Sequence, residues 1–122
     1  MNAAEDDQGI AVMCDLDGTV RSVVRDELGL AGLVPRGGSV LDLADPVDRD
    51  KAETFLRILQ REAAAFGWEV TVPWQGRLVA MHFGGGRVED ALLIVVARTR
   101  NGLARLNDEL MRINNDQMNA LR

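Results

Sequence analysis

The sequence predicts an α+β domain in which a five-stranded antiparallel sheet is interrupted by helices in the middle of the chain. Three observations predict this class. Two short β-type runs flank a polar turn near the N-terminus, one long amphipathic helix follows, and three further β-type runs come after the helix. Glycine-containing turns separate the last three runs, which favours antiparallel pairing over crossover helices.

Composition narrows the class of protein. The 122 residues are 47% hydrophobic and carry a net charge of -5, which suits one domain with a modest core and argues against nucleic-acid binding. No run approaches the ~20 apolar residues of a membrane span. Residues 1–8 are acidic and lack a signal-peptide pattern, so we expect a disordered lead-in. A single cysteine, Cys14, fits a reducing cytoplasm, and we expect no direct membrane contact.

The first predicted hairpin pairs residues 10–14 with residues 19–24 around Asp15-Leu16-Asp17-Gly18-Thr19. As structure, this is a polar turn in which Gly18 supplies a positive φ and an aspartate caps the turn. As chemistry, it resembles the nucleophile loop of haloacid-dehalogenase-type phosphatases, which implies Asp15 as the nucleophile beside a magnesium ion. That alternative also requires a phosphate-neutralising cation and a parallel sheet. The only lysine, Lys51, stands near the start of the long helix, which disfavours the phosphatase.

The middle of the chain is irregular over residues 26–39, with helical turns expected around residues 27–30 and 40–43. Asp45 is a good N-cap for the long helix, and Pro46 suits its first position. The helix is predicted to end at Gly67. Its buried stripe is Ala52, Phe55, Leu56, Leu59, Ala63 and Phe66.

Three strands are expected over residues 68–73, 77–83 and 91–98. The first two are joined around Gln75-Gly76, and residues 84–87, with three glycines, are expected to form a flexible hairpin loop. Alternation along these strands, together with the helix stripe, predicts which side chains could line a ligand pocket on the concave face of the sheet. These candidates are Phe55, Leu59, Trp68, Val70 and Met81.

The last segment carries a narrow apolar stripe at heptad spacing with a four-residue insertion. Its members are Leu103, Leu106, Leu110, Asn114, Met118 and Leu121. This stripe predicts a coiled-coil helix over residues 100–122 that forms a dimer. The alternative, an amphipathic terminal helix folded back on the sheet, stays open.

Together these segments resemble a PAS domain, the sensory module of bacterial signalling proteins. The resemblance rests on DLDGTV in the first hairpin, LDLADPVDRDK at the helix start, FGWEVTV before the last strands, and the tail LARLNDELMRINNDQMNALR. It implies a sensory unit over residues 9–99 and a signalling helix over residues 100–122. One departure is that Ala97-Arg98-Thr99 lacks the aspartate of the family's usual Asp-x-Thr exit junction.

The resemblance also bears on cofactors. Haem-binding PAS domains usually take an axial histidine from the long helix, which has none here, and flavin photoreceptors need a cysteine at its start, whereas Cys14 precedes it. Haem and covalent flavin are therefore disfavoured, and the cofactor is unknown. The sole histidine, His82, is expected to be a satisfied strand residue rather than a ligand, and we expect no metal site and no catalytic residue.

The function predicted from the sequence is a non-catalytic sensory domain that dimerises. It would relay a ligand or partner signal through its C-terminal helix to an effector in the same polypeptide. A histidine kinase of a two-component system is the expected effector, with a diguanylate cyclase as the other candidate. Trp68 and Trp74 are interpreted as core or interface residues in preference to ligand contacts.

Overall fold

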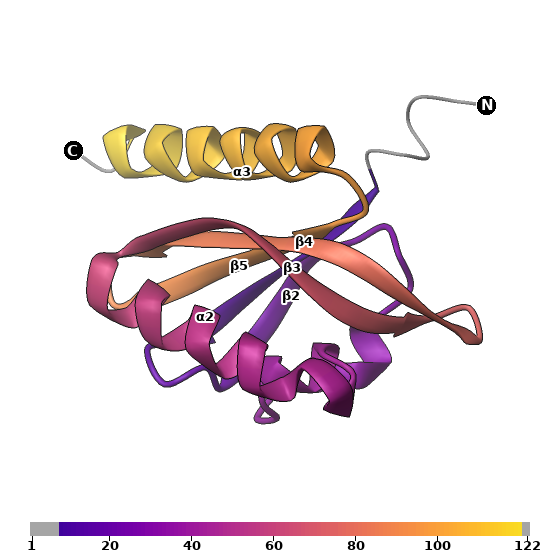
Figure 1. Ribbon diagram of the computed structural model, residues 1–122. Helices are drawn as coiled ribbons and strands as arrows, with labels where there is room; N and C mark the ends of the chain where they lie inside the picture. The colour runs from indigo at the N-terminus through magenta and orange to yellow at the C-terminus, as the bar shows by residue number, and fades with distance from the viewer. Residues whose placement is uncertain (1–7, 121–122) are drawn as a thin grey trace.

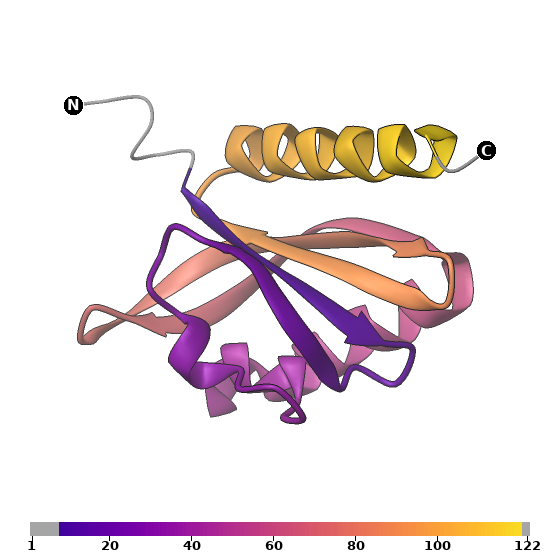
Figure 2. The same cartoon turned by 180° about the vertical axis from the view of Figure 1, so that it is seen from behind.

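The computed structural model describes residues 8–120, and the side chains of residues 8–112. A five-stranded antiparallel sheet with the order β2-β1-β5-β4-β3 separates two layers of helix. Helices η1, η2, η3 and α2 cover one face, and α3 lies alone on the other (Figures 1 and 2). The expected α+β class and the expected five antiparallel strands are confirmed. The expected lead-in over residues 1–8 lies outside the described residues except for Gln8.

The elements follow one another without a crossover between parallel strands. The strands are β1 (Gly9–Asp15), β2 (Val20–Asp26), β3 (Ala64–Trp74), β4 (Arg77–Val88) and β5 (Ala91–Ala97). The short helices are η1 (Ala31–Leu33), η2 (Val40–Leu43) and η3 (Pro46–Asp48), and the long ones are α2 (Arg49–Glu62) and α3 (Arg100–Ala120). Within residues 8–120, no helix is both long and apolar enough to cross a membrane.

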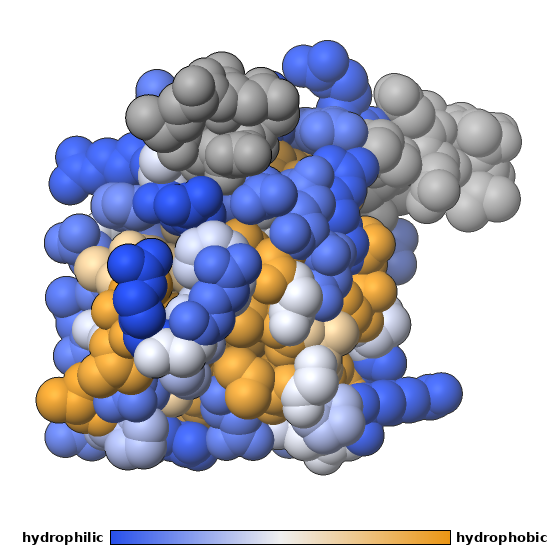
Figure 3. All heavy atoms as spheres, turned by 90° about the vertical axis from the view of Figure 1, so that its right-hand side faces the viewer, coloured by the Kyte–Doolittle hydropathy of each residue, from blue (hydrophilic) through white to orange (hydrophobic). Residues whose placement is uncertain are grey.

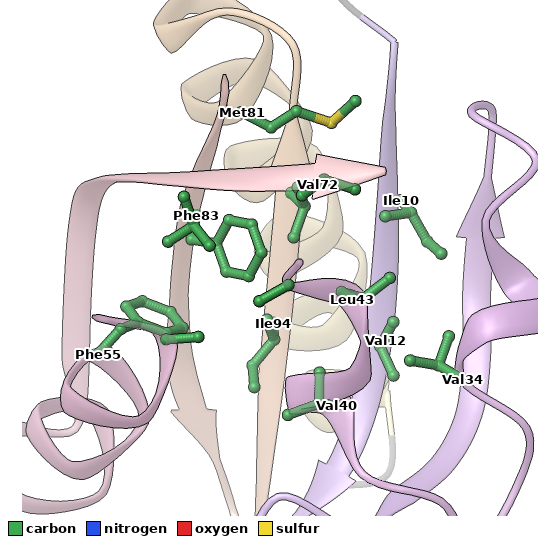
Figure 4. Close-up of a cluster of buried hydrophobic side chains, with 14 of the residues drawn as sticks. Ile10, Val12, Val34, Val40, Leu43, Phe55, Val72, Met81, Phe83 and Ile94 are labelled. Carbon is green, nitrogen blue, oxygen red and sulfur yellow. The ribbon is translucent and has the colours of Figure 1, made fainter. Parts of the chain in front are cut away.

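The hydrophobic interior consists of two clusters on opposite faces of the sheet. The larger lies between the sheet and the helices on the α2 side, and Figure 4 shows side chains of the strands, of η2 and of α2 meeting there. The smaller lies between the sheet and α3. Both depend on β5, the central strand, whose seven residues are all buried. A strand that is apolar on both faces is expected where both faces are covered.

The long helix ends earlier than predicted. Asp45 accepts the Val47 N–H at 3.0 Å, but it caps the short helix η3 and not the long helix, which begins at Arg49. At the other end α2 stops at Glu62, and Ala63 takes the left-handed conformation at φ 65°. The chain leaves the helix because the next residues join the sheet: Ala64 pairs with Gly86, and the Ala63 carbonyl accepts the Arg87 N–H at 2.9 Å.

The predicted loop over residues 84–87 is also wrong. These residues belong to β4, and the turn to β5 lies at Glu89 and Asp90. The glycines permit close approach rather than flexibility, because a Cβ at Gly85 would lie 2.3 Å from the Leu93 carbonyl oxygen. One at Gly84 would lie 2.5 Å from Cδ1 of Phe66.

Candidate functional site

The predicted pocket residues meet on the α2 side of the sheet. Phe55 and Leu59 of α2 and Val70 and Met81 of β3 and β4 are each at most 2% exposed, and all belong to the larger cluster. Trp68 is partly buried against it. Their placement on one face agrees with the sequence, while their role in ligand binding stays a prediction.

An aromatic group forms the part of this cluster nearest α2. The Phe55 ring lies 5.8 Å from Phe83, edge to face, and 6.2 Å from Trp68. Such tilted pairs are favoured by the ring quadrupoles. Because Trp68 is only partly buried while Phe55 and Phe83 are each 2% exposed, the group runs from the surface into the interior. Phe83 was missed as a pocket candidate, although its alternation with Met81 pointed to it.

The second tryptophan, Trp74, is a structural residue. Its Nε1–H donates to the Leu28 carbonyl at 2.8 Å, and the Arg98 guanidinium lies 4.8 Å from the centre of its ring. Trp74 therefore ties the β3–β4 turn to the segment after β2. Figure 3 shows the side of the molecule with this turn, where apolar surface is divided by polar side chains. Leu78, on β4 next to this turn, is 60% exposed.

The Asp15–Thr19 motif forms the turn of the first hairpin. Gly18 has φ +91°, and Asp17 caps the turn by accepting the Thr19 N–H at 2.9 Å, as predicted. This hydrogen bond holds the pKa of Asp17 below its usual value. Asp15 is paired with the Arg21 guanidinium, which also lies 3.5 Å from Asp90.

This turn also connects three elements. The Gln60 side chain of α2 donates to the Leu16 carbonyl at 2.8 Å, and the Gly18 carbonyl accepts the Val40 N–H of η2 at 3.0 Å. All strand pairings of the described sheet are antiparallel. Asp15 therefore does not lie on the parallel sheet that the phosphatase alternative requires. Among the described residues, no group of three or more His, Cys, Asp or Glu side chains could hold a metal ion.

The neighbouring Cys14 is buried in the core. Burial, with smaller contributions from the Asp15 and Asp17 charges, raises the pKa of its thiol to about 12. A thiol with so high a pKa is protonated at neutral pH and a poor nucleophile. Its position in β1 agrees with the sequence interpretation of a small apolar core residue.

His82 differs from the expectation of a satisfied histidine. It lies on β4 opposite Glu69, and its buried Nδ1 has no hydrogen-bond partner among the described residues. The only other buried side-chain atom without a partner in the described part of the chain is Oδ1 of Asn107, on α3.

The apolar stripe of α3 packs on the chain's own sheet in its first half. Leu103, Leu106 and Leu110 are at most 8% exposed, and they form one cluster with the residues of β5 that face α3. The sheet therefore covers the apolar face of these three residues, as in the alternative of a terminal helix folded back on the sheet, and a coiled coil that uses them stays a prediction. Asn114, Met118 and Leu121 lie outside the described side chains, so the second half of the predicted stripe is not tested.

Polar contacts fix the start and the middle of α3. Thr99 caps the helix: its Oγ1 accepts the Gly102 N–H at 2.9 Å and its carbonyl accepts the Leu103 N–H at 3.0 Å. Arg25 of β2 donates to Glu109 at 3.1 Å, and this pairing lowers the pKa of Glu109. The exit of the sheet is thus held by a threonine cap although the junction lacks the expected aspartate.

An open pocket of about 500 Å³ lies between the start of β3 and one flank of α3. It is lined by Phe66, Gly67, Arg100, Leu103, Ala104, Asn107 and Asp108. Sequence reasoning missed this site because Phe66 was assigned to the buried stripe of the long helix. In the structure Phe66 is 49% exposed on the opposite face of the sheet.

Comparison with known proteins supports the fold. No model of a known protein family matches the sequence, and no curated protein matches it. Among solved structures, the PAS domain of the RpfR quorum-sensing receptor of Cronobacter turicensis, in complex with BDSF, is similar. The TM-score is 0.57 at 17% identity, over 74% of this chain and 92% of that one. The chain therefore has a PAS-like fold.

Proposed function

We propose that the chain is a non-catalytic sensory domain that passes a signal from the core on the α2 side of its sheet to α3, and from α3 to an effector. The observation that carries this proposal is the double burial of β5. Leu92, Ile94 and Val96 belong to the cluster on the α2 side, whereas Leu93, Val95 and Ala97 belong to the cluster under α3. One strand thus forms the floor of both clusters, and α3 follows it within three residues.

The mechanism follows from close packing. Protein interiors are packed as densely as organic crystals, so a shift of β5 caused on one face is felt on the other. A ligand or partner that displaces side chains on the α2 side would change the fit between β5 and α3. If α3 has a docked and an undocked arrangement of similar free energy, a small change in this fit shifts the balance between them.

The stimulus is proposed to act at Phe55, Leu59, Trp68, Val70 and Met81. Trp68 is the natural entry, because it is the one member that is only partly buried. That a domain of the same fold is solved in complex with BDSF supports a small-molecule stimulus. Native mass spectrometry of the purified chain tests this: we expect a bound small molecule that Leu59→Trp displaces. Occupancy unchanged by Leu59→Trp would contradict the assignment.

The relay itself can be tested without knowing the ligand. Ile94→Ala removes apolar contacts only on the α2 side of β5, and we expect faster amide hydrogen exchange in α3 between Leu103 and Leu110. Leu43→Ala is the matched control, because Leu43 is equally buried in the same cluster but belongs to η2. Each variant should lower the free energy of unfolding by about 2–5 kcal/mol. Equal exchange of α3 in both variants at equal global stability would contradict the relay.

The effector and the oligomeric state complete the proposal. We propose a homodimer in the cytoplasm, with a histidine kinase in the same polypeptide as the effector. The PAS-like fold, shared with the domain of a quorum-sensing receptor, supports an output module in the same polypeptide. Reading the coding sequence beyond Arg122 tests this, because a phosphoacceptor-histidine helix followed by an ATP-binding domain is expected. A diguanylate cyclase there would replace the kinase by the other candidate effector.

A further inference from the structure

We propose that the pocket between β3 and α3 is a second ligand site, separate from the α2-side core, which takes a small amphiphile. Such a ligand has an apolar body, an anionic group at one end and an N–H or O–H donor that reaches Asn107. The pocket volume of about 500 Å³ lies within the usual range for small-molecule sites. Figure 1 shows α3 on the face of the sheet opposite α2, where the pocket lies.

The apolar part of the site is the Phe66 ring, which packs against the backbone at Gly84. A Cβ at Gly84 would lie 2.5 Å from the Phe66 ring and 3.2 Å from Cδ2 of Leu103, so the ring rests on the β4 backbone beside the helix. Phe66 nevertheless remains 49% exposed. An exposed aromatic ring fixed beside a buried leucine provides a wall on which an apolar ligand can stack.

The polar part of the site is Asn107. It lines the pocket, it is 9% exposed, and its buried Oδ1 accepts no hydrogen bond within the described part of the chain. Buried polar atoms are almost always paired, so an unpaired one beside a pocket indicates a missing partner. The terminal torsion of an asparagine is broad, and Oδ1 loses no hydrogen bond by turning toward the pocket.

Charges at the two ends of the pocket set the orientation of the ligand. Arg100 and Asp108 both line the pocket and are both exposed, and eight helical residues place them about 12 Å apart. An anionic group is favoured beside Arg100 and disfavoured beside Asp108. The donor therefore belongs at the end where Asn107 and Asp108 both present oxygen acceptors.

Binding there depends on the docked helix. The walls come from both β3 and α3, so the site exists only while α3 lies on the sheet. A ligand in this pocket therefore favours the docked arrangement, as any ligand favours the state that it binds. The effect of the ligand on docking rests on the proposed relay, whereas the site itself rests only on the geometry of the pocket.

Two closely related dyes test the site. 2-Anilinonaphthalene-6-sulfonate has an apolar body, a sulfonate and one N–H donor, and its N-methylanilino analogue carries a methyl group in place of that hydrogen and so has no donor. We expect fluorescence titration to give at least about tenfold tighter binding of the N–H dye by the wild-type chain, because only that dye can pair with Oδ1 of Asn107. Equal affinity for the two dyes would overturn the proposal.

Matched variants locate the binding. Asn107→Leu should bring the affinity ratio of the two dyes to about one, whereas Asn101→Leu, an exposed asparagine on the same helix, should leave it unchanged. Arg100→Gln should weaken both dyes equally and reduce the salt dependence of binding. A ratio that survives Asn107→Leu places the dye elsewhere and overturns the assignment. None of these results depends on the Ile94→Ala experiment, so the site and the relay can fail separately.

Discussion

At the scale of single residues, Gly18 shows that a motif resembling a catalytic loop has a structural role in a turn. Its φ of +91° strains any other residue, and a Cβ there would lie 2.8 Å from Cδ2 of the buried Leu56. We therefore predict that Gly18→Val lowers the free energy of unfolding by about 2–4 kcal/mol, from the positive φ and the contact together. Urea denaturation followed by circular dichroism measures this.

Gly76 offers a matched control for that variant. It has φ +75°, and nothing lies within 4 Å of an added Cβ, so Gly76→Val carries the backbone strain without the contact. We expect Gly76→Val to be the milder of the two by at least about 1 kcal/mol. Equal losses would show that Leu56 moves aside freely and that the turn is not held against α2.

At the scale of elements, the sequence predicted what depends on local pattern. The first hairpin and the buried positions Phe55 and Leu59 follow from turn chemistry and periodicity, and the structure confirms them. Asp45 is a cap as predicted, although it caps η3 and not the long helix. The end of α2 was not predictable in this way. It is set by pairing with Gly85 and Gly86 more than twenty residues later, and a glycine run reads locally as a loop.

The candidate sites likewise divide into residues that local pattern predicts and residues that depend on tertiary pairing. The α2-side candidates came from alternation and were brought together, whereas the pocket beside α3 depends on which face Phe66 occupies. A shift of the chain from helix to strand moves that ring to the other side of the sheet. The apolar stripe of α3 was recognised, but a stripe does not specify whether a sheet or a second helix covers it.

The junction of η3 with β3 also belongs to the element scale, and it predicts a pH dependence. Asp48 accepts the Thr71 N–H at 2.7 Å, and the hydrogen bonds with Thr71 hold the pKa of Asp48 below its usual value. A lowered pKa in the folded state stabilises the fold above the unfolded value of about 3.9, and this contribution is lost as the pH falls below it.

We therefore predict that Asp48→Asn lowers the urea midpoint at pH 7, and that its difference from wild type shrinks between pH 5 and pH 3. Val47→Ala serves as the control, because Val47 is 73% exposed and carries no titratable group, so its difference should stay constant across that range. A pH-independent effect of Asp48→Asn would mean that the charge of Asp48 does not contribute to this junction.

At the scale of the whole molecule, docking of α3 on the sheet and the dimerisation through α3 that the sequence predicts would require the same apolar stripe. Leu103, Leu106 and Leu110 are covered by the sheet, so a coiled coil that uses them requires α3 to leave it. Leu93 of β5 and Leu110 of α3 lie on the two sides of this contact, 2% and 8% exposed. Leu93→Gln weakens docking but leaves the helix stripe intact, whereas Leu110→Gln damages both.

This pair of variants gives opposite predictions for association. Each should lower the free energy of unfolding by about 2–5 kcal/mol, since each places a polar group at a buried leucine site. In sedimentation velocity over a concentration series, Leu93→Gln should dimerise more tightly than wild type, because its helix is released with its stripe complete. Leu110→Gln should dimerise no more tightly than wild type. If both variants associate to the same extent while circular dichroism shows the sheet to be folded, the dimer forms through another surface and docking of α3 does not control it.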